Sequence, residues 1–315
     1  MGYPIDAQGM TKIYPSSGEG VSQVDLEVPE GAIVGLIGPS GSGKTTTVRL
    51  LTGLLRPDSG SIVVLGSDPA RFGGHTRSRI GYLPQVSALY EALTVRENVD
   101  FVASLHGLRG RRRARACDRV LAFVEMEDAQ DLRVNQISGG MRRRVGLASA
   151  LVHEPDLMFL DEPTAGLDPI LRRRIWEHLS DLGGQGRTLI VTTQYVSEAI
   201  YCDYIALLTA GRMIAWGPPE ELRRRAYGGE LVDVVFAGRV PWPVVDDIAA
   251  KVEAMEVDSR GPRSVRLTVA DAGSAIPLVT SAADEAGVAL VEAERVVPDF
   301  DDVFVRMVDS HRSTV

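Results

Sequence analysis

Apolar runs and turn-forming residues divide residues 1–228 into alternating strand and helix segments. Residues 46–55 follow helical spacing and are closed by a turn at residues 57–60. The apolar runs with the length and composition of buried strands lie at residues 31–37, 157–160 and 189–192. Because strands separated by helices form parallel sheets, this pattern predicts an α/β core. Residues 91–136 break the alternation with helical spacing, which predicts an inserted helical arm.

A different pattern begins after Gly228 and Gly229. Strand-like and helical segments follow one another in the order β-α-β-β-α-β, and a last helix is predicted at residues 299–308. This order is typical of a small α+β domain of the ferredoxin-like type. We therefore predict two domains, residues 1–228 and 229–315, which agrees with a length of 315 residues.

Charge is distributed unevenly between these domains. Residues 230–315 contain 16 acidic and 8 basic side chains, so this segment carries the whole net charge of −8. An acidic segment disfavours nucleic acid as a partner, and we expect none. No run of 18 apolar residues is present, so we expect no membrane-spanning helix. Two cysteines without metal-ligand spacing indicate a reducing compartment.

A glycine-rich segment follows the first apolar run. It matches G-x-x-x-x-G-K-[ST], in which glycines let backbone N–H groups point inward around nucleotide phosphates. The helix that follows adds the positive end of its dipole. Lys44 is predicted to reach the outer phosphates, and the Thr45 hydroxyl to help hold Mg²⁺. The residues expected around the phosphates are Gly38, Pro39, Ser40, Gly41, Ser42, Gly43, Lys44, Thr45 and Thr46.

An acidic pair, Asp161 and Glu162, directly follows the apolar run at 157–160. Such a pair at a strand end is often a helix cap, but the phosphate loop earlier in the chain favours a catalytic interpretation. We expect Asp161 to orient Mg²⁺ through a water molecule. We expect Glu162 to act as the general base that polarises the attacking water.

Residues 137–141 read Ile-Ser-Gly-Gly-Met and resemble the signature motif of the ATP-binding subunits of ABC transporters. The two glycines open a helix N-terminus toward a γ-phosphate, and the hydroxyl of Ser138 adds a donor. Many members have glutamine where this chain has Met141, and the longer run through Arg144 is frequent in exporter subunits of the daunorubicin-resistance type. The resemblance covers residues 5–225 and implies a P-loop NTPase core.

The resemblance also assigns roles to further residues. Tyr14 stands where an aromatic ring stacks on adenine, and Gln85 where a glutamine contacts Mg²⁺ and moves with the membrane partner. Ser138, Gly139 and Gly140 would contact the nucleotide of a second copy. Asp168 belongs to the segment that crosses the dimer interface in the family. Residues 89–98 resemble the exporter pattern that follows this glutamine.

One position departs from the family pattern. Gln194 stands where most members have a switch histidine. Glutamine can donate a hydrogen bond to a γ-phosphate, but it cannot become positively charged. We therefore expect Gln194 to take part in hydrolysis, with turnover that depends little on pH in the range where histidine titrates.

The resemblance implies a homodimer that encloses ATP and Mg²⁺ and drives a membrane-spanning permease encoded as a separate chain. The subunit would lie peripherally on the cytoplasmic face of the membrane, and the exported substrate would be drug-like, a lipid or a polysaccharide. Two alternatives remain. A soluble ABC ATPase with a non-transport target is disfavoured because tandem ATPase halves, long coiled coils and zinc cysteines are missing from the sequence. A weakly hydrolytic nucleotide sensor is disfavoured by the intact Asp161 and Glu162.

Overall fold

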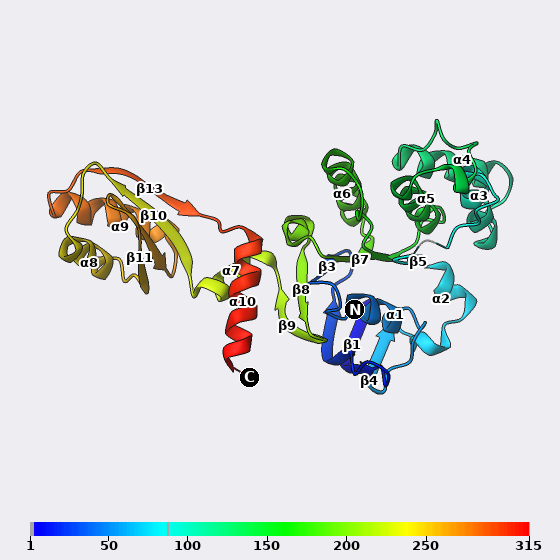
Figure 1. The fold of residues 1–315 in the computed structure, drawn as a ribbon, viewed down its shortest axis with the longest axis horizontal. Coiled ribbons are helices and arrows are strands. Elements are labelled where there is room, and N and C mark those ends of the chain that lie inside the picture. The colour runs from blue at the N-terminus through cyan, green and yellow to red at the C-terminus, as the bar shows by residue number, and fades with distance from the viewer. Residues whose placement is uncertain (1–2, 87, 315) are drawn as a thin grey trace. The chain divides into compact units, whose positions relative to one another are not determined.

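The chain forms two compact units, Met1–Trp216 and Gly217–Val315, in a computed structural model that describes residues 3–86 and 88–314 (Figure 1). The sequence predicted the boundary at residues 228 and 229. The structure divides the chain earlier, because helix α7 (Pro219–Tyr227) packs against helix α10 (Phe300–Thr314) within the second unit.

A six-stranded sheet organises the first unit. Its order is β5-β6-β7-β3-β8-β9, and the pairings from β5 through β8 are parallel. The strands are β3 (Ile33–Ile37), β5 (Ile80–Leu83), β6 (Leu157–Asp161), β7 (Thr188–Thr193), β8 (Tyr204–Thr209) and β9 (Arg212–Gly217). Every residue of β3, β6 and β7 is buried, as expected for central parallel strands. This arrangement confirms the predicted α/β core of the P-loop NTPase type.

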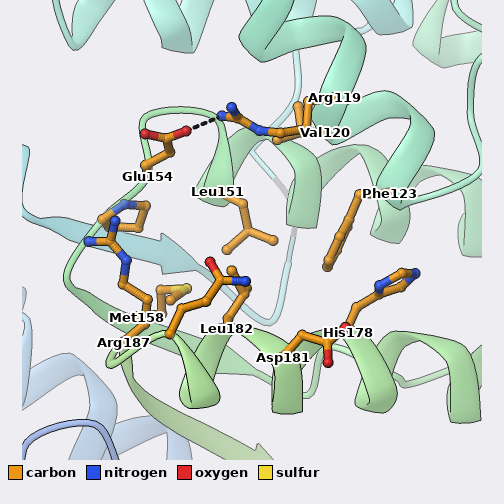
Figure 2. A pocket seen from close by; sticks show the side chains of 12 residues that line it. Arg119, Val120, Phe123, Leu151, Glu154, Met158, His178, Asp181, Leu182 and Arg187 are labelled. Atoms are coloured by element: carbon orange, nitrogen blue, oxygen red, sulfur yellow. Dashed lines mark ion pairs between the residues drawn. The ribbon is translucent and has the colours of Figure 1, made fainter.

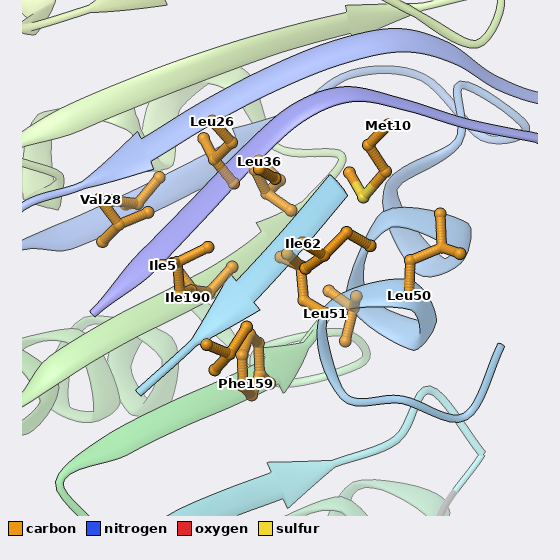
Figure 3. Packing of buried hydrophobic residues seen from close by; sticks show 14 of the residues in the cluster. Ile5, Met10, Leu26, Val28, Leu36, Leu50, Leu51, Ile62, Phe159 and Ile190 are labelled. Atoms are coloured by element: carbon orange, nitrogen blue, oxygen red, sulfur yellow. The ribbon is translucent and has the colours of Figure 1, made fainter. Parts of the chain in front are cut away.

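A second, antiparallel sheet of three strands lies in the same unit. Its order is β2-β1-β4, formed by β1 (Ile5–Ile13), β2 (Gly20–Val28) and β4 (Ser59–Val64). Figure 3 shows how the main core forms between the two sheets and helix α1 (Lys44–Leu51). Ile5 and Ile62 of the small sheet pack with Leu51 of α1, and with Phe159 and Ile190 of the large sheet. The phosphate loop therefore begins and ends on well-buried elements.

The predicted helical arm is confirmed. Helices α3 (Val95–Leu105) and α4 (Gly110–Phe123) lie within residues 91–136, and both pack against α5 (Gly139–Leu151), as Figure 1 shows. The remaining helices of the first unit are η1 (Pro69–Arg71), α2 (Gly74–Ser78), η2 (Val134–Gln136), α6 (Pro169–Gly184) and η3 (Val196–Tyr201). No helix in the part of the chain that the structure describes is long and apolar enough to cross a bilayer.

The second unit contains an antiparallel sheet in the order β11-β12-β10-β13. Its elements are β10 (Glu230–Phe236), α8 (Trp242–Lys251), β11 (Glu256–Gly261), β12 (Ser264–Val269), α9 (Ala272–Glu285) and β13 (Leu290–Val296). The first and third strands of this unit pair at the centre, with Val232 opposite Leu267. Two interlocked β-α-β units give this strand order, so the predicted ferredoxin-like domain is confirmed.

Candidate functional site

The glycine-rich loop connects the end of β3 to the first turn of α1. Gly43 immediately precedes α1 and has a φ of 104°, a conformation that L side chains rarely adopt. A Cβ atom at Gly38 would lie 2.1 Å from the carbonyl oxygen of Leu208, so only glycine fits there. These two positions explain why the motif needs glycine, and they leave the loop N–H groups free of side-chain bulk.

Lys44 is the first residue of α1 and is 5% exposed. Its ammonium group donates hydrogen bonds to the carbonyl oxygens of Gly38, at 2.7 Å, and Pro39, at 2.9 Å. Burial lowers the pKa of Lys44, whereas the negative charges of Glu162 and Asp161 act in the opposite direction. The loop therefore holds a buried cation against its own backbone.

Asp161 ends β6 and is completely buried. Its Oδ1 accepts hydrogen bonds from the hydroxyl of Thr192 and, at 3.3 Å, from that of Thr45. The other carboxylate oxygen, Oδ2, is buried and has no partner. A buried carboxylate oxygen without a partner is costly, which indicates that a bound group completes its coordination.

Glu162 follows directly and has a φ of 54°, which is uncommon for a non-glycine residue. Its N–H donates to the hydroxyl of Thr192 at 2.9 Å and lies 3.1 Å from the carbonyl oxygen of the same residue. Backbone strain of this kind is concentrated at functional sites. Thr192 therefore contacts both members of the acidic pair, a connection that spacing along the sequence does not reveal.

A cavity of about 320 Å³ brings many of the predicted residues together. Three residues that the sequence did not single out, Glu19, Gly20 and Arg49, also line it. The predicted residues among its lining are Tyr14, Ser40, Gly41, Ser42, Gly43, Lys44, Thr45, Thr46, Gln85 and Glu162. Gly38 and Pro39 are not among the lining residues, and their carbonyl oxygens accept hydrogen bonds from Lys44. A polyphosphate fits this cavity because the lining combines backbone donors, a cation and small side chains.

The donor set beside the loop also suits a hard divalent cation. The free Oδ2 of Asp161 and the hydroxyl of Thr45 are oxygen ligands of the kind that Mg²⁺ prefers. Gln85 lines the phosphate-loop cavity, and its side chain would add an amide oxygen.

Other predicted residues lie outside this cavity. Ser138 caps α5, where its Oγ accepts a hydrogen bond from the N–H of Met141, and Gly139 and Gly140 form the first turn. Asp168 caps α6, and hydrogen bonds from the N–H groups of Leu171 and Ile170 lower its pKa. Gln194 is exposed directly after β7. None of these residues lines the cavity formed by the chain's own phosphate loop.

From the sequence alone, a run of arginines such as residues 142–144 would be expected on a helix surface or at a dimer interface, but Arg143 is buried within its own chain. Arg143 is 7% exposed, and its guanidinium bonds the main-chain carbonyl oxygens of Pro84, Gln85 and Glu162. An arginine run without apolar spacing reads as a solvated face, so no signal in the sequence marked this one as buried.

A second cavity of the first unit is lined largely by apolar side chains. It has a volume of about 500 Å³ and lies between α4, α5 and α6, as Figure 2 shows. Phe123, Leu151 and Met158 form part of its apolar lining, and an ion pair of 2.6 Å between Arg119 and Glu154 lies at its rim. No residue that the sequence predicted as functional lines this cavity, so the phosphate-loop site remains the candidate.

Comparisons with known proteins agree with this geometry. The family described as ABC transporter matches residues 21–165. The chain is 41% identical to the daunorubicin resistance ATP-binding protein DrrA3 of Streptomyces coeruleorubidus, covering 98% of this chain and 96% of that protein. It is 40% identical to the Nod factor export ATP-binding protein I of Cupriavidus metallidurans, covering 75% of this chain and 78% of that protein.

A solved structure is similar as well. The dimeric post-hydrolysis state of the ATP-binding cassette MJ0796, bound to ADP and Pi, superposes with a TM-score of 0.63 at 27% identity. The match covers 68% of this chain and 98% of that one. With the glycine loop, the acidic pair and the near full-length relative in agreement, this chain belongs to the ATP-binding proteins of ABC transporters, is an ATPase, and resembles the daunorubicin-resistance exporter branch.

Proposed function

We propose that this chain hydrolyses ATP as a homodimer and drives a separate membrane-spanning permease that exports a drug-like, lipid or polysaccharide substrate. The observation that carries the proposal is the meeting of Lys44, Glu162 and the phosphate loop around one cavity, with Asp161 hydrogen-bonded to Thr45 of that loop. We assign ATP binding to the unit Met1–Trp216 and an accessory role to the unit Gly217–Val315.

In this mechanism the chain first exchanges internal hydrogen bonds for bonds to ATP. Lys44 leaves the carbonyl oxygens of Gly38 and Pro39 and binds the β- and γ-phosphates. Thr45, Gln85 and Asp161 would hold Mg²⁺, which neutralises developing phosphate charge when it is bound.

Glu162 then accepts a proton from the water molecule that attacks the γ-phosphate in line. Gln194 would donate a hydrogen bond to the γ-phosphate from the end of β7. Tyr14 lines the same cavity, and its ring would stack on adenine.

The second copy would complete each site. Ser138, Gly139 and Gly140 begin a helix, so their N–H groups and the Ser138 hydroxyl form a positive helix end that can meet a γ-phosphate. They lie outside the cavity of their own chain, as a site shared between two copies requires. Asp168, at the start of the next helix, would lie at the same interface.

The transport role is supported by the relatives, whose names describe daunorubicin resistance and Nod factor export. A subunit of this kind would act from the cytoplasmic face of the membrane, bound to its permease. The name of the first relative supports a drug-like substrate, and the permease would form the translocation path.

The experiment that tests this function uses the Glu162→Gln variant of the full chain. Loss of the general base is expected to lower steady-state ATP hydrolysis by roughly 10²- to 10⁴-fold. With ATP and Mg²⁺ the variant should run as a dimer in size-exclusion chromatography, and it should retain a polytopic membrane protein from detergent-solubilised native membranes. Wild-type hydrolysis by this variant would contradict the base assignment. A dimer that retains ribosomal or DNA-bound proteins instead would contradict the exporter assignment.

A further inference from the structure

Arg143 lies on α5, the helix that begins with the Ser138 cap. Its side chain is buried although arginine is almost never fully buried without a partner. In the described chain its hydrogen bonds go to main-chain carbonyl oxygens rather than to a carboxylate. The buried guanidinium therefore acts on the main chain that it contacts.

The guanidinium joins two separate loops. Its Nη1 donates to the carbonyl oxygens of Pro84, at 2.6 Å, and Gln85, at 2.9 Å, while its Nε donates to that of Glu162 at 3.0 Å. These loops follow the neighbouring parallel strands β5 and β6. Because a guanidinium is planar and rigid, the three bonds set the position of one loop relative to the other.

Glu162 is consequently held from both sides. Its N–H donates to Thr192, and its carbonyl oxygen accepts from Arg143. The backbone between these two bonds has the left-handed φ of 54°. A strained conformation persists only when its surroundings enforce it, and the bond from Arg143 is one of the two that do so.

The charge of Arg143 also acts on the site. Burial lowers its pKa, and the negative charges of Asp161 and Glu162 oppose that effect. Arginine remains protonated in proteins, so a fixed positive charge lies near two carboxylates that otherwise repel each other.

We propose that Arg143 is a positioning residue for ATP hydrolysis, which holds the main chain of Glu162 and Gln85 so that both side chains face the γ-phosphate. The inference rests on the proposed role of Glu162. It also ties the helix that begins at Ser138 to the hydrolytic loops of its own chain.

The test compares Arg143→Gln and Arg143→Lys with the wild-type full chain. Arg143→Gln is expected to lower kcat roughly 10- to 100-fold, because small displacements of a reacting group have effects of this size. The KM for ATP should change little, since the residue does not line the nucleotide cavity. Arg143→Lys should recover part of kcat, because lysine restores the charge but not the planar set of donors.

Arg96→Gln is the matched control. Arg96 bonds Gln130 and Asp118, each at 2.7 Å, entirely within the helical arm. Its loss should lower the thermal midpoint while leaving kcat near wild type. If Arg143→Gln also lowers only the midpoint, or if Arg143→Lys fully restores kcat, the positioning role is wrong.

Glu162→Gln, measured alone and combined with Arg143→Gln, separates this inference from the function on which it rests. If Arg143 acts through Glu162, the double variant should hydrolyse no more slowly than Glu162→Gln. If the two substitutions instead lower hydrolysis by independent factors that multiply in the double variant, only the inference about Arg143 is contradicted. Wild-type hydrolysis by Glu162→Gln would instead contradict the base assignment itself. If Arg143→Gln does not fold, the same comparison is made with Arg143→Lys.

Discussion

Each of the two units contains a buried carboxylate, and the two carboxylates differ in whether both of their oxygens accept hydrogen bonds. In the second unit Glu230 is 7% exposed and fully partnered. Its oxygens accept from the N–H of Ala272 at 3.0 Å, from Arg224 at 2.6 Å and from Arg295 at 3.4 Å. In the first unit Asp161 is completely buried, and its Oδ2 accepts no hydrogen bond.

We interpret Glu230, whose oxygens all have partners, as a group that stabilises the fold. We interpret Asp161, whose Oδ2 has none, as a group that binds a ligand. A satisfied buried carboxylate contributes to folding, whereas an unsatisfied one costs about 1–3 kcal/mol or more. Within residues 3–86 and 88–311, every buried side-chain polar atom found without a partner lies before residue 217. The hydroxyl of Ser42 in the phosphate loop is among them. Among these residues, buried side-chain polar atoms without hydrogen-bond partners are thus found in the ATP-binding unit and not in the accessory unit.

The largest effect on ATP hydrolysis is expected from replacing Asp161, whose Oδ2 has no hydrogen-bond partner. Asp161→Asn is expected to reduce ATP hydrolysis roughly 10- to 100-fold, because it weakens the orientation of Mg²⁺. The free energy of unfolding without nucleotide should not fall, since the variant removes a buried charge whose Oδ2 is unpartnered. Activity and chemical denaturation of the same preparation measure both quantities. A variant that loses stability and keeps activity would show that Asp161 is structural.

The satisfied carboxylate should behave in the opposite way. Glu230→Gln is expected to lower the free energy of unfolding by about 1–3 kcal/mol, because charge-assisted hydrogen bonds are lost. The kcat for ATP should remain unchanged. Thermal unfolding and hydrolysis of the full chain check the two expectations, and a large loss of kcat would contradict the separation of the two units.

The same residue predicts a dependence on pH. The hydrogen bond from Ala272, together with Arg224 and Arg295, holds the pKa of Glu230 below its usual value. Its contribution to stability is therefore complete above the unfolded pKa of about 4.3 and is lost as the pH falls through the lower folded pKa. Glu230→Gln should remove this part of the acid sensitivity.

The smallest effect is expected at Gln194, which directly follows β7. Gln194→His should change kcat by less than roughly tenfold but add a titration step near pH 6.5 to the pH profile of hydrolysis. The wild-type chain should lack that step, because glutamine does not ionise. An identical step in both proteins would assign it to another group.

Motifs whose members are close together in the chain were predictable. The spacing of Gly38 and Gly43 indicates the loop because each glycine meets a local backbone requirement. The apolar run ending at Leu160 places Asp161 and Glu162 at a strand end. The strand and helix order of residues 229–315 likewise indicated the ferredoxin-like sheet, since each strand pairs according to a common topology.

Contacts between distant segments were not predictable. Arg143 looked like one member of a solvated arginine run, and Thr192 like an ordinary strand residue. Their partners follow neighbouring strands that meet only after the parallel sheet has formed. By itself the sequence thus determined the phosphate-loop motif and the acidic pair, and it predicted that these residues bind ATP. The tertiary structure alone decided how the acidic pair is held, because hydrogen bonds across strand ends depend on the order of the strands and leave no periodic signal in the chain.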